Sequence, residues 1–378
     1  MKIGFDAKRA VSNRTGLGNY SRSLVQHLAA FHPEHDYHLF SPSADATLLD
    51  PMLAQQDHVH LHKSKARIKS YWRSFSIVKD LQQTGIQLYH GLSNELPYGM
   101  ERSGIKSVVT IHDLIFKVHP ETYGVAERMI YDRKFRHACA VADRIVAISE
   151  HTKNDIVRFY GTDPERISVI YQSCRDHFYH RRSEAELAKV RETFQLPESY
   201  FLYVGTVEAR KNLKSIITAY EQGLREKQIP LVIVGRGGPY ADACKAAIRQ
   251  AGLEHLFIWK ENVHDSLSLQ AIFQMAAALI YPSSYEGFGL PVAEALLSGT
   301  AVITSSLSSL PEAAGPDAYY IDPAHPESII TAASSILNDP AQALSRTIKG
   351  AEYVRARFDP AALTNRMVNC YLSVSLER

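Results

Sequence analysis

The sequence predicts an α/β protein with two doubly wound domains, each built on a parallel sheet. The chain holds 378 residues, whereas a soluble domain usually holds about 100 to 200. Short β-branched and aromatic runs alternate with helical patterns along the chain, which is typical of parallel α/β sheets. Near-continuous apolar runs such as 144–148 and 231–235 fit central strands that helices cover on both faces. We therefore expect two domains with full hydrophobic cores.

The order of these runs divides the chain. We expect strands at 2–5, 87–90, 107–111, 144–148, 200–205, 231–235 and 278–281. A charged segment, 173–198, precedes a new strand–turn–helix unit and is the expected link. We predict a first domain over 1–180, a second over 190–358, and a last helix within 359–378. Apolar side chains recur along that helix at helical spacing, so one of its faces must be buried: Leu363, Met367, Cys370 and Tyr371.

Composition excludes several classes of protein. Forty-two basic and 40 acidic residues leave a net charge of +2, which argues against a broad basic face for nucleic acid. Four cysteines without a CxxC pair favour reduced thiols over a zinc site or disulfide framework. The chain opens on a strand-like run, and no run approaches the roughly 20 apolar residues of a membrane span. We expect a cytoplasmic protein, either free or at the inner face of the cytoplasmic membrane.

The strongest chemical signal is a glycine turn between two glutamates, Glu286 and Glu294, directly after an apolar run. Pro291 suits the first turn of a helix, where its missing N–H costs nothing. The N–H groups at such a helix start form an anion site, here those of Phe288, Gly289 and Leu290. Two isolated glutamates are more often a loop carboxylate and a helix cap. The glycine turn between them favours carboxylates that accept hydrogen bonds from sugar hydroxyls.

This Glu-x7-Glu motif, with Gly-Phe-Gly-Leu-Pro inside it, resembles the family-4 retaining glycosyltransferases. The resemblance implies the GT-B fold, in which two Rossmann-like domains face each other across a cleft and the C-terminal helix crosses back to the first domain. It also implies that Glu286 faces the donor sugar and that Glu294 binds the ribose of the nucleotide.

A second constellation follows the first strand of the second half. Arg210 and Lys211 leave that strand through a turn at Gly205, and cations at such a strand end suit the diphosphate of a sugar nucleotide. A solvated Arg–Lys pair on a loop is the alternative. The stretch resembles the diphosphate-binding loop of the same family, in which an arginine directly follows the glycine. Thr206 replaces it here, so Arg210 is expected to substitute.

The first half offers weaker signals. Gly16 and Gly18 resemble a dinucleotide fingerprint, but Ser21 stands where the third glycine belongs, and a tight strand-to-helix turn is an equal alternative. In the family this loop approaches the donor phosphates. His112 follows a strand, where a lone histidine is more often structural. The resemblance instead implies that His112 contacts the donor sugar, with Asp113 orienting the loop.

Two other segments complete the expected sites. Near 259–264 members of the family usually have a Gly-x-Val turn whose backbone contacts the nucleotide base. Glu261 replaces the glycine here, and we still expect the backbone of Val263 to contact the base.

Basic and aromatic residues gather over 63–73, which suits a peripheral membrane surface, although a solvated basic helix face is equally compatible. His58, His60 and His62 alternate without a carboxylate and are expected to be surface residues, not a metal site.

These signals combine into one functional prediction. We expect a metal-independent, retaining hexosyltransferase, with mannose as the first candidate for the hexose. The donor is expected to be GDP-mannose or a UDP-sugar, and the acceptor a glycan or lipid-linked glycan. No Asp-x-Asp pair is present, and Arg210, Lys211 and the helix N-terminus would take the electrostatic role of a metal. An epimerase or phosphorylase of the same fold, a Rossmann dehydrogenase and a non-catalytic subunit remain alternatives.

Overall fold

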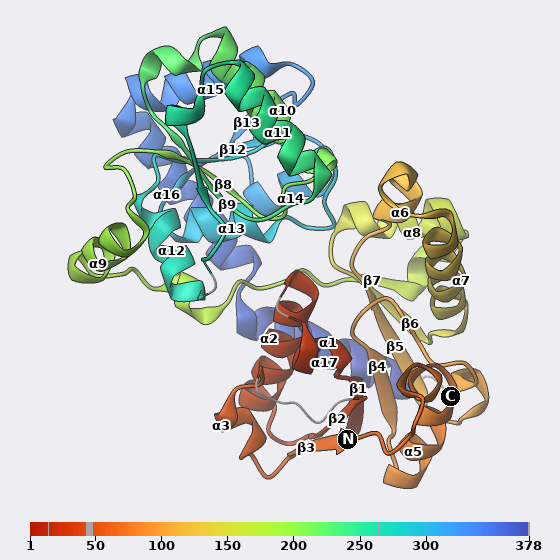
Figure 1. The fold of residues 1–378 in the computed structure, drawn as a ribbon. Helices are drawn as coiled ribbons and strands as arrows, with labels where there is room; N and C mark the ends of the chain where they lie inside the picture. Colours follow the sequence, from red (N-terminus) through yellow and green to blue (C-terminus); the bar gives the residue numbers. More distant parts are fainter. Residues whose placement is uncertain (14, 43–47, 264, 377–378) are drawn as a thin grey trace. The chain divides into compact units, whose positions relative to one another are not determined.

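The chain forms two compact units, each a parallel sheet between layers of helices (Figure 1). Unit 1 comprises Met1–Ser173 and Phe358–Arg378, and unit 2 comprises Cys174–Arg357. The computed structural model describes residues 1–13, 15–42, 48–263 and 265–376. The predicted fold class, two Rossmann-like parallel-sheet domains, is confirmed.

Unit 1 contains a seven-stranded sheet in the order β3-β2-β1-β4-β5-β6-β7, with every pair parallel. The strands are β1 (Lys2–Asp6), β2 (Asp36–Ser41), β3 (Val59–Lys63), β4 (Leu88–Gly91), β5 (Lys106–Ile111), β6 (Arg144–Ala147) and β7 (Ile167–Val169). The central strands are buried on both faces, as their continuous apolar runs require. From β1 the chain winds outward to β3 and then returns to β4 on the other side of β1. A crevice at the carboxyl ends of β1 and β4 follows from this reversal.

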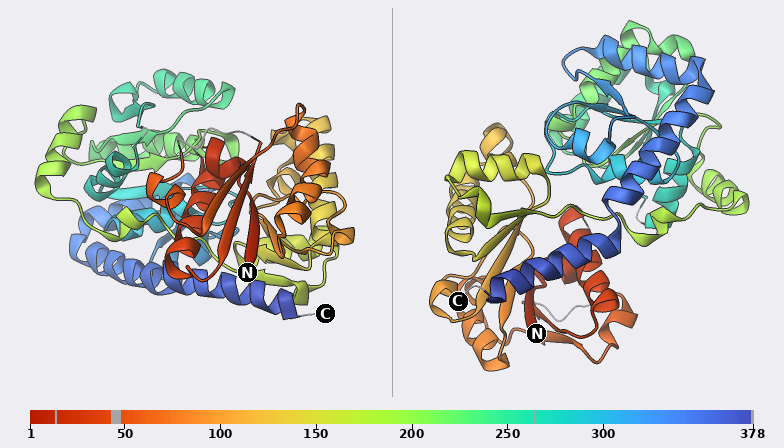
Figure 2. Two further views of the ribbon diagram at one scale, coloured as in Figure 1. Left: turned by 90° about the horizontal axis from the view of Figure 1, so that it is seen from below. Right: turned by 180° about the vertical axis from the view of Figure 1, so that it is seen from behind.

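Helices cover both faces of this sheet. They are α1 (Lys8–Ser12), α2 (Gly16–Phe31), α3 (Pro51–Ala54), α4 (Lys69–Tyr71), α5 (Ile77–Thr84), α6 (Ile115–Val118), α7 (Val125–Val141), α8 (Glu150–Tyr160) and α17 (Pro360–Leu376). Side chains of α5, α7 and α8 join one core cluster with the strands. The last helix, α17, packs beside α2 and against β5 on the opposite face (Figure 2). The apolar face expected for this helix is thus buried in unit 1.

Unit 2 repeats the plan with six strands in the order β10-β9-β8-β11-β12-β13, all parallel. The strands are β8 (Phe201–Val204), β9 (Leu231–Val234), β10 (Phe257–Lys260), β11 (Ala278–Tyr281), β12 (Ala301–Ser305) and β13 (Tyr319–Ile321). The winding direction reverses between β8 and β11, so the loops that follow these two strands leave neighbouring carboxyl ends. That edge is where doubly wound sheets bind ligands.

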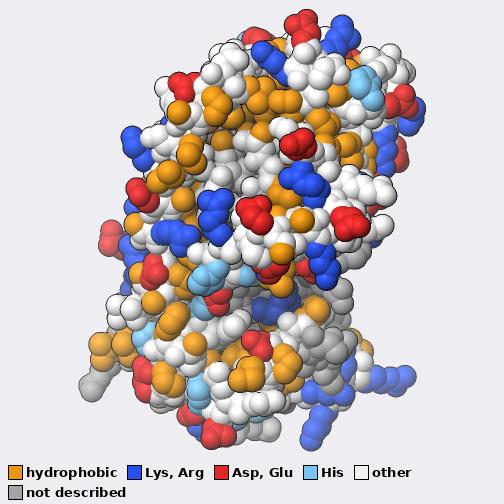
Figure 3. Space-filling model, turned by 90° about the vertical axis from the view of Figure 1, so that its left-hand side faces the viewer, with side chains coloured by type: hydrophobic (Ala, Val, Ile, Leu, Met, Phe, Trp, Pro, Cys, Tyr) orange, Lys and Arg blue, Asp and Glu red, His pale blue; other side chains and the backbone are white. Residues whose placement is uncertain are grey.

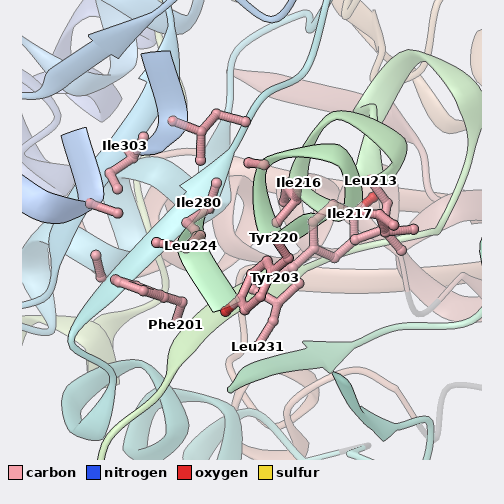
Figure 4. Close-up of a cluster of buried hydrophobic side chains, with 14 of the residues drawn as sticks. Phe201, Tyr203, Leu213, Ile216, Ile217, Tyr220, Leu224, Leu231, Ile280 and Ile303 are labelled. Atoms are coloured by element: carbon pink, nitrogen blue, oxygen red, sulfur yellow. The ribbon is translucent and has the colours of Figure 1, made fainter. Parts of the chain in front are cut away.

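One core cluster of unit 2 lies on the face of its sheet where Phe201, Tyr203, Ile280 and Ile303 meet the helix that carries Ile216 (Figure 4). The helices are α9 (Glu184–Phe194), α10 (Leu213–Gln222), α11 (Pro239–Gln250), α12 (Ser266–Met275), α13 (Leu290–Leu297), α14 (Leu310–Ala314), α15 (Pro326–Asn338) and α16 (Pro340–Arg357). Residues of α10, α11 and α15 complete this core.

The segment expected as a link is more structured than predicted. Residues 176–179 form a 3-10 helix, η5 (Asp176–Tyr179), and α9 begins with a capping box at Ser183 and Glu186. From Cys174 onward the segment belongs to unit 2. The chain therefore leaves unit 1 at the very start of the expected link, and it returns at Phe358.

Candidate active site

The residues predicted to hold the donor follow β8 and β11, the two strands at the reversal point of unit 2. Glu286 lies in the loop between β11 and α13, and Arg210 and Lys211 lie in η6 (Ala209–Lys211), which connects β8 to α10. Hydrogen bonds join the two loops: Ser284 N–H donates to the Arg210 carbonyl at 2.7 Å. The sequence elements that were predicted separately thus meet at one edge of one sheet.

Glu286 is a buried carboxylate held on several sides. Its Oε1 accepts hydrogen bonds from Tyr281 Oη at 2.8 Å and Ser283 Oγ at 3.0 Å, and Arg210 Nη1 lies 2.7 Å away. Burial by itself raises the pKa of Glu286, but Lys211 and Arg210 outweigh it and hold the pKa below its ordinary value. The side chain is therefore an ionised, oriented carboxylate at neutral pH.

Arg210 occupies the centre of a small ion-pair network. Besides Glu286, it reaches Glu208 Oε1 from Nη2 at 2.7 Å, and Nη1 donates to the Tyr285 carbonyl at 2.8 Å. Thr206, where the family more often has an arginine, is exposed. The guanidinium of Arg210 therefore binds groups of both loops, Glu208 in one and Tyr285 and Glu286 in the other. The sequence did not indicate this role.

Lys211 is a buried cation beside the glycine turn. A Cβ on Gly205, whose φ is +123°, would lie 2.5 Å from Lys211 Nζ, so the turn leaves room for the ammonium. Burial lowers the pKa of Lys211, while Glu286 opposes the shift. Within the described part of the chain, Nζ makes no hydrogen bond or ion pair; it lies 5.4 Å from the centre of the Tyr281 ring. A buried ammonium in this state is suited to receive an anion.

The helix that follows Glu286 begins as predicted. Gly289 is its N-cap with φ +112°, and Pro291 lies in the first turn. A Cβ on Gly289 would lie 2.8 Å from Leu310 Cδ2, so only glycine fits this turn. Leu290 lies in the first turn of α13 and Phe288 precedes its N-cap, so the anion site expected at this helix start stays a prediction.

Glu294 differs from Glu286 in its surroundings. It lies inside α13, is buried, and its carboxylate forms no hydrogen bond or ion pair to any residue that the structure describes. Burial raises the pKa of Glu294 to about 7, with Arg175 acting in the opposite direction. An unpaired buried carboxyl costs free energy, which hydroxyl donors from a ligand would offset.

The loop predicted to contact the base follows β10, at the same edge of the sheet and two strands away from β8. Val263 is half-buried there. Arg236, from the loop after β9, donates from Nε to the Glu261 carbonyl at 2.8 Å and from Nη2 to Asn262 Oδ1 at 2.9 Å. Two hydrogen bonds from Arg236 therefore hold this loop, at the position where the family has a glycine turn.

In unit 1, His112 directly follows β5 and is buried. Its Nε2 lies 2.9 Å from the Leu92 carbonyl, and its Nδ1 lies 3.3 Å from the side-chain nitrogen of Gln172. Burial lowers the pKa of His112 to about 4, so the ring is neutral at pH 7. Asp113 accepts the Ile115 N–H at 3.1 Å and so shapes the start of α6.

The glycine pair of unit 1 forms a helix start. Gly16 opens α2 with open space around its Cα, whereas a Cβ on Gly18 would lie 1.9 Å from the Asn13 carbonyl oxygen. Gly18 is therefore required by close packing. The short helix α1 stands between β1 and this turn, which a dinucleotide fingerprint would not contain.

The basic segment 63–73 is only partly a surface. Trp72 is buried and donates from Nε1 to Asp80 at 2.7 Å. Arg73 pairs with Asp6 and, at 2.7 Å, with Glu95 Oε2. The expectation that these two residues belong to an exposed patch is wrong, because the π-helix η1 (Trp72–Ser76) turns them into the core. The remaining exposed members are Lys63, Lys65, Arg67, Ile68, Lys69 and Tyr71.

The alternating histidines lie at an edge of the unit 1 sheet. His62 Nε2 is 2.8 Å from His38 Nδ1, and His58 Nε2 is 3.1 Å from the Ala29 carbonyl. The rings of His38 and His60 are tilted by 33°, with centroids 4.6 Å apart. Among the described residues, no group of three or more His, Cys, Asp or Glu side chains is arranged to hold a metal ion.

Two sequence profiles match consecutive parts of the chain. The profile described as Glycosyltransferase Family 4 matches residues 14–173, and the profile described as Glycosyl transferases group 1 matches residues 184–353. This chain is a family-4 glycosyltransferase. O-antigen chain mannosyltransferase B of Escherichia coli is 28% identical over 98% of this chain and 99% of its own length.

Solved structures share the GT-B fold of this glycosyltransferase. Anabaena HepE in complex with UDP and glucose superposes with a TM-score of 0.74 at 17% identity, over 99% of this chain and 100% of its own. Sucrose-phosphate synthase from Thermosynechococcus elongatus superposes with a TM-score of 0.76 at 20% identity, over 99% of both chains. The family assignment removes the dehydrogenase alternative.

The surface of the glycosyltransferase agrees with its balanced charge. On the face shown in Figure 3, acidic and basic side chains are interspersed, and no broad basic area forms. None of the helices in the described ranges is both long and apolar enough to cross a bilayer.

Several site residues carry no signal in the sequence of the glycosyltransferase. Tyr281 and Ser283, which hold Glu286, read as the end of an ordinary buried strand. Gln172, which contacts His112, belongs to none of the motifs in the sequence. Only their hydrogen-bonding distances to Glu286 and His112 in the folded chain identify these residues as part of the candidate site.

Proposed function

We propose that this enzyme is a retaining, metal-independent hexosyltransferase that transfers mannose from GDP-mannose to a hydroxyl of a glycan or lipid-linked glycan. Three considerations support mannose: the family, the run Arg210-Lys211-Asn212, by which the diphosphate loop resembles a variant found in that family, and the name of the Escherichia coli relative that matches nearly the whole chain. A UDP-sugar is the alternative donor, because the Anabaena neighbour was solved with UDP and glucose.

The observation that carries the proposal is the buried, unpaired ammonium of Lys211 beside the ionised Glu286. In the proposed complex Lys211 binds the donor diphosphate, together with Arg210 and the first turn of α13. Glu294 accepts the ribose hydroxyls, and backbone groups near Val263 contact the base. In this complex the diphosphate would compensate the buried charge of Lys211, and the ribose hydroxyls would compensate that of Glu294.

The proposed reaction uses this charge distribution. The bond from sugar C1 to the diphosphate oxygen breaks, an oxocarbenium-like sugar forms, and the acceptor hydroxyl oxygen bonds to C1 on the face that the diphosphate leaves. The hydroxyl proton passes to the departing diphosphate. Lys211 and Arg210 stabilise the negative charge that develops there, and the carboxylate of Glu286 stabilises the positive sugar.

Unit 1 is proposed to bind the acceptor and to supply His112 to the donor sugar. Its exposed basic and aromatic residues, from Lys63 to Tyr71, are proposed to contact anionic lipid at the cytoplasmic membrane. Gly16 and Gly18 are proposed to let the start of α2 approach the donor phosphates.

A donor screen followed by a transfer assay tests the proposal. Thermal unfolding is recorded with GDP-mannose and UDP-sugars, since a ligand that binds the folded state raises the melting temperature. Transfer to an oligomannoside or lipid-linked acceptor is then measured for the wild type, Glu286→Gln and the matched control Glu254→Gln, which changes an exposed glutamate of the same unit. We expect transfer from GDP-mannose, lost in Glu286→Gln and kept in Glu254→Gln. Equal transfer by all three proteins contradicts the assignment, and sugar-nucleotide isomerisation without acceptor indicates an epimerase.

A further inference from the structure

His112 packs against one end of a buried network of hydrogen bonds within unit 1. The edge of its ring contacts Tyr20, with centroids 4.7 Å apart and planes at 88°. Tyr20 Oη lies 3.0 Å from Thr110 Oγ1, which lies 2.8 Å from His90 Nε2. His90 Nδ1 in turn lies 2.7 Å from the hydroxyl of Tyr371 on α17. The plane of the His112 ring is therefore fixed by packed and bonded side chains.

The protonation of His112 follows from its two neighbours. A carbonyl only accepts, so the Leu92 carbonyl beside Nε2 requires the proton on Nε2. Because the ring is neutral at pH 7, Nδ1 then carries a lone pair and must accept from the amide N–H of Gln172. The amide orientation of Gln172 is thus determined by the histidine, with its Oε1 turned away from the ring.

Gln172 occupies a special place in the chain. It is buried and lies two residues before unit 2 begins at Cys174. Its neighbour Tyr171 packs edge-on against Phe358, the first residue after the chain returns to unit 1, with ring centroids 5.3 Å apart. The side chain that completes the surroundings of His112 therefore stands where the chain passes between the units.

We propose that Gln172 is a positioning residue for His112, which keeps Nδ1 of the imidazole as a hydrogen-bond acceptor and directs it toward a hydroxyl of the donor sugar. The inference rests on the proposed function, because it assigns His112 to the donor. At 3.3 Å the bond between the two side chains is at the long end of the range, so a sugar hydroxyl can share or replace it. Gln172 then holds the ring ready without competing strongly for its lone pair.

The charge around His112 makes this arrangement sensitive to one substitution. The titratable groups that face the ring are Arg9 of α1, His90 of β4 and Tyr20 of α2, and Asp113 follows it in the chain. None of the side chains within hydrogen-bonding distance of the ring, as the structure describes it, is a carboxylate. A carboxylate at position 172 would add one, and it would stabilise a proton on Nδ1.

Two variants and a matched control test the proposal. Gln172→Met keeps the length of the side chain and removes the hydrogen bond, Gln172→Glu reverses its polarity, and Ser173→Ala changes the adjacent residue without touching His112. Transfer from GDP-mannose is measured as kcat and donor KM at pH 6 to 9. In the free proteins the nitrogen signals of His112 are recorded by NMR after ¹⁵N-histidine labelling and assigned with His112→Gln. Thermal unfolding checks that each protein is folded.

We expect Gln172→Met to lower kcat by up to about 100-fold, with a donor KM within about threefold of the wild type. In Gln172→Glu we expect a protonated His112 at neutral pH, and a kcat that recovers as the pH rises. Ser173→Ala should match the wild type in both measurements.

Wild-type kcat in both Gln172 variants overturns the proposal, and so do unchanged His112 signals in Gln172→Glu. If Gln172→Met does not fold, Gln172→Glu alone decides. A wild type that transfers no sugar refutes the proposed function instead, and the NMR signals then still show whether Gln172 sets the state of His112.

Discussion

Arg210 and Glu286 form an ion pair that ties the two loops of the donor site together. Arg210 Nη1 lies 2.7 Å from Glu286 Oε1, and its Nη2 lies 2.7 Å from Glu208 Oε1. The loop after β8 is thereby joined to the loop after β11. The candidate catalytic carboxylate is oriented by the protein itself, which is the form of preorganisation that lowers reaction barriers.

Replacing Arg210 with methionine should move the pH dependence of transfer. Arg210 and Lys211 together keep the pKa of Glu286 low against the effect of burial. Without the guanidinium the carboxyl binds a proton at higher pH, so we expect the acid limb of kcat/KM to move upward. The matched control is Glu208→Gln, which removes the other partner of Arg210. Superimposable pH profiles for Arg210→Met and the wild type would contradict this role.

Lys211→Met should abolish donor binding. The substitution removes the buried ammonium that is proposed to bind the donor diphosphate, and it leaves the buried carboxylate of Glu286 with Arg210 as its cation. We expect GDP to give no thermal shift in this variant. Lys214→Met, which changes an exposed lysine of α10, is the control and should keep the shift. A wild-type thermal shift with GDP in Lys211→Met would contradict the proposed contact.

Glu294 should make nucleotide affinity depend on pH. Its pKa is raised from 4.5 to about 7, so its contribution to stability is present below pH 4.5 and is lost as the pH rises through about 7. Ribose hydroxyls donate best to the ionised carboxylate, so GDP should bind more tightly at pH 8 than at pH 6. Titration calorimetry with Glu294→Gln should give a weaker and flatter profile. An affinity that falls with pH in the wild type would argue against this contact.

Gly289→Ala should disturb the donor site through the backbone. The residue has φ +112°, and an added Cβ would lie 2.8 Å from Leu310 Cδ2. Gly252→Ala provides a matched comparison, because Gly252 has φ +65° and open space around it. We expect the first substitution to cost about 1 to 3 kcal/mol and to weaken GDP binding, and the second to leave GDP binding unchanged. Thermal unfolding with and without GDP measures both effects.

Arg73→Met should unfold unit 1 more easily than any change to the exposed lysines nearby. The substitution leaves Asp6, a buried carboxylate, without its cation. Breaking a buried pair from one side costs about 3 to 5 kcal/mol. Lys65→Met, at an exposed position, should change stability little. Equal melting temperatures for the two variants would show that Arg73 is an exposed residue of the basic segment and not part of a buried ion pair.

Local chemistry predicted the backbone of the two loops after β8 and β11 well. The turn from Glu286 to Pro291, and the cations after Gly205, carry their geometry within a few residues, since glycine and proline fix backbone angles and parallel strand ends gather ligands. The seven predicted strands, including 200–205 and 278–281, correspond to real strands. Short-range rules suffice where the residues in question are neighbours in sequence.

Contacts between distant residues could not be predicted in this way. The strands β2, β3, β7, β10, β12 and β13 were not predicted, since short or partly polar runs such as Val59–Lys63 become strands only by pairing with neighbours. Trp72 and Arg73 read as surface residues because their partners, Asp80 and Asp6, are set by the fold. The contact between Gln172 and His112 spans 60 residues.

The return of the chain to unit 1 at Phe358 determines the order in which the enzyme can mature. Unit 2 is one continuous stretch of sequence, whereas unit 1 needs α17, which follows all of unit 2 in the chain. Until Tyr371 is synthesised, the hydrogen bond to buried His90 has no partner, and the layer that α2 and α17 form on one face of the first sheet is incomplete. The half of the enzyme that is synthesised first is therefore completed only after unit 2, and removal of α17 should prevent the N-terminal half from completing its fold.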